Sequence, residues 1–498
     1  MTLGELLDGL DLPLLDKGNL ESRIRGISSD SRTVRSGDLF VCMPSPSRDT
    51  HDFLVGAAGQ GATAAFCHSP EGFSLALSLG MGAALLPRRT SVFFKAAGEA
   101  AHRIFDNPTQ AMTLVGVTGT NGKTSTAWML RDALQILRGP SAYLGTLGFK
   151  TPQGLSELSN TTPWPVDLAS ITQQARKQGC SCMTLEASSH ALVEERLAGV
   201  LFDVGVFTNL TQDHLDFHGT MEAYAEAKRL LFTQKADESR AAGKQFTSVI
   251  NVGNATGASW ATEVPGPVLT FGSRDADLQV KALEARADSL RLEALLQGQT
   301  AEFSLGFGGQ FHIENASAAL GALIALGHSL DQSCEALSWA SATPGRFEPV
   351  HNDLGFSVLV DYAHTPDALS TLLASVRQLP HRRIITLFGC GGDRDRTKRP
   401  LMAQAAAEGS DLIILTSDNP RTEDPQQILN DAKSGLGLCE SRIIPDRSEA
   451  IVAAVSLAQP GDILVLAGKG HENYQIIGKD KLPFDDREVA RRALTAKG

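Results

Sequence analysis

A glycine-rich turn between a short apolar run and a helical segment is the feature that most constrains how this chain folds. The run 113–119 is rich in β-branched residues, and residues 123–137 carry apolar side chains at helical spacing. The turn between them, GVTGTNGKTS at 116–125, offers backbone N–H groups at the start of a helix, where the helix dipole favours an anion. Glycine at 119 and 122 permits the tight backbone that such a turn needs. We therefore predict a phosphate-binding loop on a strand–turn–helix unit.

The loop departs from the standard pattern G-x-x-x-x-G-K-[ST], which requires glycine where this chain has Val117. Lys123 is expected to reach the β- and γ-phosphates of ATP, and the Thr124 hydroxyl to bind Mg²⁺. The shortened loop TGTNGKT keeps both residues and predicts ATP binding, in place of a chance glycine-rich turn with a surface lysine. The residues expected at the nucleotide are Gly119, Thr120, Asn121, Gly122, Lys123, Thr124 and Ser125.

Short strands and helices alternate along most of the chain, which predicts α/β domains with largely parallel sheets. The length of 498 residues suggests about three domains. We place an N-terminal α/β domain at 1–90, a central P-loop ATPase-like parallel-sheet domain at 91–342 and a C-terminal Rossmann-like α/β domain at 343–498. The stretch 278–305 alternates apolar and polar residues, which predicts an antiparallel patch.

Strands and helices are predicted by residue range as follows. In the central domain, strands are expected at 183–185, 204–207 and 247–250, and a helix at 313–327. In the C-terminal domain, strands are expected at 357–361, 383–388, 411–416 and 462–467, and helices at about 366–379, 399–408, 425–435, 447–458 and 485–496. Such open α/β sheets leave their functional loops at the carboxyl ends of the strands.

Composition excludes several classes of function. The 45 basic and 56 acidic side chains give a formal net charge of −11, which disfavours a surface that wraps nucleic acid or binds anionic lipid. No run approaches the roughly 18 apolar residues of a membrane helix, and the N-terminus lacks the basic lead of a secretory signal. The seven scattered cysteines do not suggest a disulfide framework. We expect a cytoplasmic enzyme, and nothing demands more than a monomer.

Polar side chains follow two further strands of the central domain. Glu186 ends the run at 183–185, and His214 lies shortly after 204–207, so both are expected at the same sheet edge as the phosphate loop. Glu186 is a hard oxygen ligand suited to Mg²⁺, whereas imidazole generally suits softer metals. His190, His214 and His218 lack the close ligand pairs of zinc sites. Read without context, such histidines are more often capping or core residues than ligands. We reject zinc.

Nine segments, in order along the chain, resemble the Mur ligase family of bacterial cell-wall synthesis. They are TGTNGKT, EASSH, TNLTQDHLDFHGTMEAYAEAK, NASAAL, GRFE, DYAHTPDAL, FGCGGDRDRTKRP, SDNPRTEDP and GKGHENYQ. The resemblance extends from about residue 26 to the C-terminus. It implies amide formation driven by ATP, in which the D-Glu γ-carboxylate of UDP-N-acetylmuramoyl-L-alanyl-D-glutamate becomes an acyl phosphate that an incoming amine attacks.

The resemblance also implies two Mg²⁺ ions and a modified lysine. Thr124 and Glu186 would hold one ion, and His214 and Lys228 the other. An unmodified lysine repels Mg²⁺, so Lys228 would carry a carbamate, formed when CO₂ adds to the neutral amine. The alternative is that Lys228 is an ordinary exposed lysine of a helix. The catalytic residues implied in this way are Lys123, Glu186, His214 and Lys228.

The family's motifs imply further contacts for both nucleotides. For ATP, Asn315 resembles the adenine contact, and Arg346 and Asp361 resemble the γ-phosphate and ribose contacts, with His364 nearby. A carboxylate at Glu194, where close relatives usually carry glutamine, would be unfavourable beside an anionic substrate. The residues implied at the uridine-linked precursor are Ser29, Ser31, Asn160, Thr161, Thr162, Ser188, Glu194, Arg196 and Lys228.

The segment DNPR at 418–421 indicates which amino acid is added. Meso-diaminopimelate differs from lysine by a second carboxylate, which a guanidinium binds through two parallel hydrogen bonds. By the resemblance, Arg421 performs this role, Glu472 takes the far ammonium, and relatives that add lysine lack the arginine. The structural alternative is that Arg421 pairs with Glu423 or Asp424 at the surface. The residues implied at diaminopimelate are Arg394, Asp418, Asn419, Pro420, Arg421, Gly468 and Glu472. Cys390 is expected to be a small packed residue and not a nucleophile.

Three other functions remain open on the sequence alone. The nearest is the same ligase adding L-lysine, against which Arg421 argues. Folylpolyglutamate synthase shares the shortened loop, but it is not expected to show DNPR or an N-terminal uridine-binding region. A non-catalytic nucleotide-gated binding protein is expected to lose Lys123, Glu186, His214 or Lys228, and all four are present.

Overall fold

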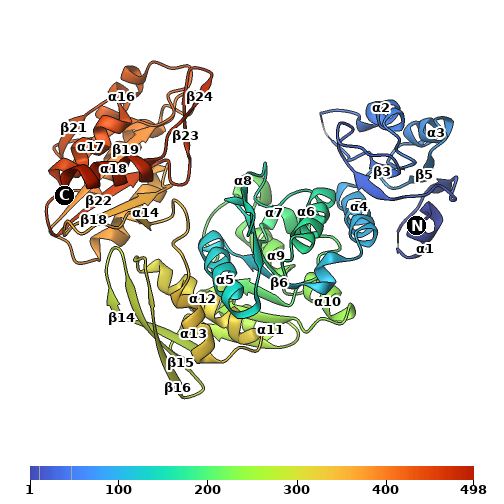
Figure 1. The fold of residues 1–498 in the computed structure, drawn as a ribbon, viewed down its shortest axis with the longest axis horizontal. Helices are drawn as coiled ribbons and strands as arrows, with labels where there is room; N and C mark the ends of the chain where they lie inside the picture. The colour runs from blue at the N-terminus through green and yellow to red at the C-terminus, as the bar shows by residue number, and fades with distance from the viewer. Residues whose placement is uncertain (11, 46) are drawn as a thin grey trace. The chain divides into compact units, whose positions relative to one another are not determined.

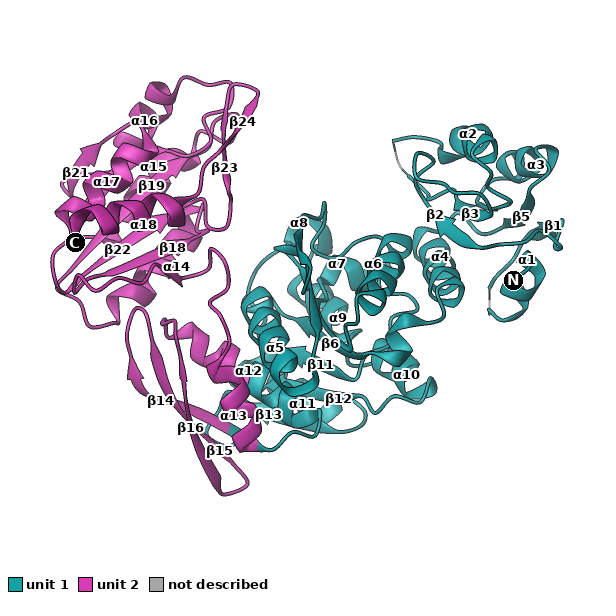
Figure 2. Ribbon diagram, viewed as in Figure 1, with its two compact units in different colours: residues 1–278, 318–329 teal, residues 279–317, 330–498 magenta. Residues whose placement is uncertain are grey.

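The computed structural model describes residues 1–10, 12–45 and 47–498 (Figure 1). The chain divides into two compact units, which Figure 2 colours separately. Unit 1 comprises Met1–Leu278 and Ala318–Ser329, and unit 2 comprises Gln279–Ser317 and Leu330–Gly498. Among the described residues, no helix combines the length and the apolar character needed to cross a bilayer.

The first sheet of unit 1 has the strand order β1-β5-β4-β3-β2 and is buried on both faces. Leu39 and Val41 of β3 pack towards α1 and α4, whereas Phe40 and the following Cys42 pack towards α2 and α3. This alternation places helices on both faces of the sheet (Figure 1). The bounds are β1 Asp16–Gly18, β2 Gly26–Ser28, β3 Asp38–Val41, β4 Ala64–Cys67, β5 Gly82–Leu85, α1 Leu3–Asp8, α2 Leu54–Gly59, α3 Pro70–Ser78 and α4 Thr90–Ile104.

The second sheet of unit 1 runs β13-β12-β11-β6-β10-β7-β8-β9. Its central strand β6 pairs in parallel with β10 and β11, so the loops that follow these three strands meet at one edge. The predicted strand–turn–helix unit and parallel sheet are confirmed. The strands are β6 Thr113–Thr118, β7 Ser141–Gly145, β8 Gly148–Thr151, β9 Gly154–Ser156, β10 Cys182–Glu186, β11 Val204–Phe207, β12 Thr247–Asn251 and β13 Val268–Phe271. The helices are α5 Lys123–Arg138, α6 Pro165–Lys177, α7 Ser189–Val193, α8 Leu215–His218, α9 Met221–Arg229, α10 Gln234–Ala241 and α11 Ala255–Glu263.

An antiparallel patch opens unit 2. Strands β15 (Leu290–Leu296) and β16 (Gln299–Leu305) pair antiparallel in register from Leu290↔Leu305, beside β14 (Leu278–Ala285). The antiparallel patch predicted at 278–305 is therefore confirmed. Helix α12 (Phe311–Ala325) begins in unit 2 and ends in unit 1, and α13 (Leu330–Ser338) belongs to unit 2.

The last large sheet has the order β17-β18-β22-β19-β20-β21 and is parallel from β18 to β21. Helices α14, α15 and α16 cover one face, and α17 and α18 cover the other. The strands and helices predicted here are confirmed to within two residues at each end. The bounds are β17 Glu348–Pro349, β18 Ser357–Asp361, β19 Arg383–Cys390, β20 Leu412–Ser417, β21 Glu440–Ile443, β22 Asp462–Ala467, β23 Tyr474–Ile477, β24 Asp480–Pro483, α14 Pro366–Arg377, α15 Lys398–Gly409, α16 Pro425–Lys433, α17 Arg447–Leu457 and α18 Asp486–Lys497.

Candidate active site

The predicted phosphate loop connects β6 to α5, and its conformation requires glycine at two positions. Gly119 has φ 149°, and a Cβ atom there would lie 1.9 Å from the Thr208 hydroxyl oxygen. Gly122 has φ 82° and is the N-cap residue of α5. The loop is held by the segment after β11, since the Thr120 N–H donates to the Asn209 carbonyl at 2.9 Å. The backbone N–H groups of the helix start are therefore presented at the carboxyl edge of the sheet.

Glu186 ends β10 as a fully buried carboxylate that accepts hydrogen bonds from three residues. Tyr143 Oη donates at 2.5 Å, Thr146 donates its N–H at 2.9 Å and its hydroxyl at 3.1 Å, and the Thr124 hydroxyl donates at 3.0 Å. Thr124 and Glu186 thus lie side by side. A hydroxyl next to a fixed carboxylate is an oxygen donor set that fits a hard cation such as Mg²⁺.

Two lysines donate to one carbonyl oxygen of the loop. Lys123 Nζ lies 2.9 Å and Lys228 Nζ 2.8 Å from the Gly119 oxygen. Lys228 is 1% exposed, and its Nζ lies 4.2 Å from the centroid of the Tyr224 ring. Burial, assisted by the charge of Lys123, lowers the pKa of Lys228 to about 6. The alternative that Lys228 is an exposed lysine is therefore wrong, and its amine is mostly neutral at pH 7.

His214 is the N-cap residue of α8 and has φ 52°. Its ring centroid is 6.0 Å from that of Tyr224 and 5.0 Å from that of His190. His218 Nε2 lies 2.9 Å from the Ser189 hydroxyl. Burial lowers the pKa of both His190 and His218, which favours the neutral form of these two rings. The predicted role of His214 as a metal ligand stays a prediction.

The residues predicted for the dipeptide end of the precursor gather beside Glu186. The Thr162 hydroxyl donates to the Glu186 carbonyl oxygen at 2.7 Å and lies 3.3 Å from the hydroxyl of Ser188, which caps α7. The Thr161 hydroxyl lies 3.3 Å from that of Thr146. Asn160 directly precedes them in the chain. At the first sheet, Ser29 and Ser31 lie in the loop that follows β2.

Glu194 has a partner that sequence reasoning missed. Arg196 Nη2 lies 2.6 Å from Glu194 Oε2, and Arg196 Nε donates to the same oxygen at 2.8 Å. Arg196 also donates to the Thr162 carbonyl at 3.1 Å and lies 3.9 Å over the Trp164 ring. The carboxylate is therefore paired with a fixed guanidinium, which reduces the expected repulsion of an anionic substrate.

In unit 2, Asp361 ends β18 and orders the segments around it. Its carboxylate accepts the Phe347 N–H and the Ala363 N–H, both at 2.8 Å. Burial raises the pKa of Asp361, and the nearby charge of Arg346 opposes that rise. The Arg346 guanidinium carbon lies 5.0 Å from the centroid of the Tyr362 ring. The backbone carbonyl oxygen of Tyr362 lies 2.9 Å from His364 Nδ1. Asn315 is buried on α12, and the ATP contacts of this group stay predictions.

Arg421 follows β20 with φ 52°, and its guanidinium donates to the Gly392 carbonyl at 2.7 Å. The surface salt bridge considered above is not formed, because Glu423 binds Arg396 at 2.8 Å and Arg399 at 2.7 Å. Among the described residues, no carboxylate lies within ion-pair distance of Arg421. The guanidinium is thus anchored by one nitrogen and keeps donors for a ligand.

The other residues predicted at the amino acid surround Glu472. The Asn419 amide donates to Glu472 Oε2 at 3.0 Å, and Lys469 Nζ lies 3.0 Å from the same oxygen. Gly468 has φ 112°, and a Cβ atom there would lie 2.9 Å from Asp418 Oδ2. Lys469 was missed from the sequence, because it lies in the turn after β22, where spacing alone does not say which side chains meet.

The remaining members of this group differ in exposure. Burial raises the pKa of Asp418. Pro420 lies between Asn419 and Arg421, and Arg394 is exposed on the loop after β19. Cys390 ends β19 in the core, where burial raises its thiol pKa to about 12. Its expected role as a packed residue is confirmed.

Known proteins match this chain over nearly its whole length. A model described as Mur ligase middle domain matches residues 117–323, and one described as Mur ligase, glutamate ligase domain matches residues 345–470. UDP-N-acetylmuramoyl-L-alanyl-D-glutamate–2,6-diaminopimelate ligase of Geobacillus thermodenitrificans is 40% identical over 474 residues, covering 95% of each chain. Its namesake from Gloeobacter violaceus is 40% identical over 505 residues, covering 100% of this chain and 99% of that one. A solved structure of a ligase with this name has a TM-score of 0.74 at 33% identity and covers 100% of this chain and 99% of its own. The chain therefore belongs to the Mur ligase family.

Proposed function

We propose that this chain is an ATP-dependent ligase of peptidoglycan precursor synthesis that adds meso-diaminopimelate to UDP-N-acetylmuramoyl-L-alanyl-D-glutamate. The relatives that match over their full length carry the name of this reaction. The observation that carries the choice of amino acid is the Arg421 guanidinium, which is anchored by a carbonyl and pairs with no carboxylate among the described residues. With ATP as co-substrate, the reaction belongs in the cytoplasm, and we expect a monomer.

The first chemical problem is that a carboxylate must approach a triphosphate. Thr124 and Glu186 fit one Mg²⁺, and His214 with a carbamate on Lys228 would hold a second; the ions supply charge neutralisation between the two anions. Lys123 binds the β- and γ-phosphates, and the loop N–H groups orient them. The neutral, buried amine of Lys228 supports the carbamate, because CO₂ adds only to an unprotonated amine.

The reaction then proceeds on the substrates. The D-Glu γ-carboxylate attacks the γ-phosphate and releases ADP, leaving an acyl phosphate. The amine of the amino acid attacks the acyl carbon and expels phosphate, forming the amide. Arg196, fixed by Glu194 and the Trp164 ring, contributes positive charge beside the dipeptide end of the precursor.

The choice between diaminopimelate and lysine depends on the distal carboxylate. Arg421 binds that carboxylate with the nitrogens that do not contact Gly392, and Glu472, oriented by the Asn419 amide, receives the neighbouring ammonium. Lysine would leave the guanidinium without a counter-charge. A site built for a polar group rejects an analogue that lacks it by as much as about 10⁴-fold.

A phosphate-release assay tests the function. The full chain, ATP, Mg²⁺ and the UDP-muramoyl dipeptide are incubated with meso-diaminopimelate, with L-lysine, or with no amino acid. We expect rapid release with diaminopimelate alone, and a tripeptide product by mass spectrometry. Equal rates with lysine would exclude the role of Arg421. Absence of release in every arm would exclude the ligase and favour the non-catalytic alternative. Activity with a folate substrate would favour folylpolyglutamate synthase.

A further inference from the structure

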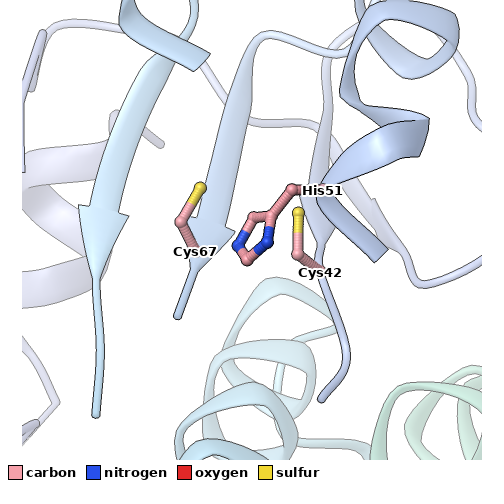
Figure 3. Close-up of side chains that lie close together, drawn as sticks. All are labelled: Cys42, His51 and Cys67. Carbon is pink, nitrogen blue, oxygen red and sulfur yellow. The ribbon is translucent and has the colours of Figure 1, made fainter. Parts of the chain in front are cut away.

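Two cysteines and a histidine lie together in the core on one face of the first sheet (Figure 3). None of the three is among the residues proposed for the ligase reaction. Strands β3 and β4 pair in parallel with Val41 opposite Phe66, and the Cys42 N–H donates to the Phe66 carbonyl at 3.0 Å. The next pair in this register is Cys42 and Cys67. Parallel neighbours in register point to the same face, so both thiols lie on the side of α2 and α3.

The third member of this cluster, His51, lies in the short 3-10 helix Thr50–Phe53. Cys42 and Cys67 are 0% exposed and His51 is 4% exposed. One potential ligand atom from each of the three side chains lies within 4.8 Å of the other two. Figure 3 shows the imidazole between the two sulfur atoms. Two thiols and an imidazole converge at one buried point.

The hydrogen bonds of His51 assign its two ring nitrogens. His51 Nδ1 lies 2.6 Å from Asp49 Oδ1, so this nitrogen carries a proton that it donates to the carboxylate. Nε2 accepts the His68 N–H at 3.2 Å and therefore keeps its lone pair. A carboxylate that receives the second ring N–H is the usual partner of a metal-binding histidine. A Cβ atom on Gly72 would lie 2.1 Å from the ring, so α3 holds the imidazole in place.

A separate observation comes from His68, which directly follows Cys67. Its ring centroid lies 4.2 Å from that of His51, and one of its ring nitrogens is within 4.8 Å of a ring nitrogen of His51. Both ring nitrogens of His68 are buried, and neither has a hydrogen-bond partner among the described residues. Such a buried polar group without a partner requires an explanation.

We propose that Cys42, His51 and Cys67 bind one thiophilic metal ion. Two thiolates and one imidazole form a donor set that suits Zn²⁺ in tetrahedral coordination, with the fourth position left to a water molecule. The exposed Asp49 is not needed as a ligand, because its oxygen orients His51. The ion takes the place of the His68 backbone N–H at the lone pair of His51 Nε2. Through its ligands it links the segment after β3 to the end of β4.

The site is separate from the residues proposed for catalysis, and its consequence is structural. Cys42 directly follows β3, and Cys67 is the last residue of β4. Both therefore lie at the carboxyl edge of the first sheet, where the loop with Ser29 and Ser31 follows β2. A metal bound there stabilises the folded form of this first sheet, because the ligands do not converge in an unfolded chain. The metal site and the ligase activity can therefore be tested independently.

Cobalt binding to the metal-free full chain tests the proposal directly. Co²⁺ bound to thiolates gives a charge-transfer absorption that histidine or carboxylate ligands do not give. We expect this band to saturate at one equivalent of Co²⁺ and to disappear when Zn²⁺ is added. Cys42→Ser and Cys67→Ser should lose the band, and the matched control Cys439→Ser, which changes a thiol of unit 2, should keep it.

A measurement on the unaltered chain covers the case in which a serine variant fails to fold. Cys42 and Cys67 are alkylated with iodoacetamide and the modified sites are mapped by mass spectrometry. Zn²⁺ at ten times its dissociation constant should slow alkylation of both by about 10-fold, by reducing the population of the open form, and leave Cys439 unchanged.

Four results would overturn the proposal. They are no metal bound, metal bound without the thiolate band, a band that persists in both serine variants, and a Cys42–Cys67 disulfide in the isolated protein. Metal without the band would mean binding at other groups, such as His190, His214 and His218. Phosphate release with the muramoyl precursor is measured on the same preparations, and its loss or presence does not decide the metal site.

Discussion

Lys228, beside the phosphate loop, and Lys469, beside Glu472, are both buried lysines with different partners. Lys469 is 0% exposed and donates to Glu472 at 3.0 Å. Lys228 donates to the Gly119 carbonyl, and no carboxylate of the described residues lies within ion-pair distance of it. A buried amine beside a carboxylate is stabilised as a cation, whereas one without such a partner loses its proton. The comparison separates a lysine that is held by a carboxylate from one that is held without a carboxylate.

The largest expected effect is at Lys228. Replacing it with alanine removes the proposed carbamate and should lower kcat by about 10³-fold, as loss of a group that stabilises transition-state charge does. Short carboxylic acids such as acetate should partly restore turnover in this variant. Lys228→Arg is the matched comparison, since it keeps a long side chain that ends in nitrogen but cannot form a carbamate, and it should be equally inactive. Steady-state phosphate release measures all three, and full activity of either variant would remove Lys228 from the mechanism.

Arg421→Ala should raise the KM for diaminopimelate by about 10²-fold, because a buried charge pair with the substrate is lost. The KM for ATP should change little. Arg442→Ala, which removes an exposed arginine of the same sheet, is the control and should leave both constants unchanged. Initial rates at varied substrate separate the two constants, and an equal loss for both substrates would point to a folding role for Arg421.

Substitution by methionine should affect stability differently at the two lysines. Lys469→Met leaves Glu472 without its cation and should lower the free energy of unfolding by about 3 kcal/mol. Lys228→Met removes an amine that has no carboxylate partner and should not lower it. Urea denaturation at pH 8 measures both. Equal destabilisation by the two substitutions would contradict the distinction between these lysines.

The stability of the folded chain should also report the protonation of Lys228. Burial and the charge of Lys123 lower its pKa from 10.5 to about 6. Between these pH values the unfolded chain holds a proton that the folded chain lacks, so the free energy of unfolding rises with pH in this window and this contribution levels off below pH 6. In CO₂-free buffer, the wild type should gain up to about 1.4 kcal/mol per pH unit more than Lys228→Met between pH 6.5 and 8.5. Identical slopes would show that Lys228 keeps its proton.

Glu194→Gln should have the smallest effect. The substitution removes the ion pair with Arg196 and leaves the guanidinium to the anionic precursor, so the KM for the precursor should fall by about 3-fold, the size expected for one partly exposed pair. The KM for diaminopimelate should not change. A rise in this KM would mean that Glu194 is needed to position Arg196.

The sequence predicts the parts of this molecule that depend on local pattern. Strands such as Val204–Phe207 and Asp462–Ala467 are recovered at their ends, because an apolar run between polar turns is a strong local signal. The phosphate loop is recovered for the same reason, since Gly119 and Gly122 have backbone conformations that other residues rarely adopt.

What the sequence does not predict depends on contacts between distant segments. The pairing of Cys42 with Cys67 requires the register of β3 and β4, and the burial of Lys228 requires Tyr224 and the phosphate loop to pack against it. The left-handed conformation of Arg421 occurs in a residue with no local preference for it. The ion pair between Glu194 and Arg196 was not predicted, although the two residues are close in sequence. The sequence pattern does not indicate the direction in which either side chain points.

The Gly119 carbonyl oxygen, which accepts from both Lys123 and Lys228, makes these two positions interdependent. An oxygen of this kind has two lone pairs, and the two amines share them. Removing one amine changes the field and the hydrogen bonding of the other, so the double variant should depart from the sum of the single ones. A chain that loses one of these lysines therefore presents a different environment to the other, so substitutions at the two positions have to be evaluated together.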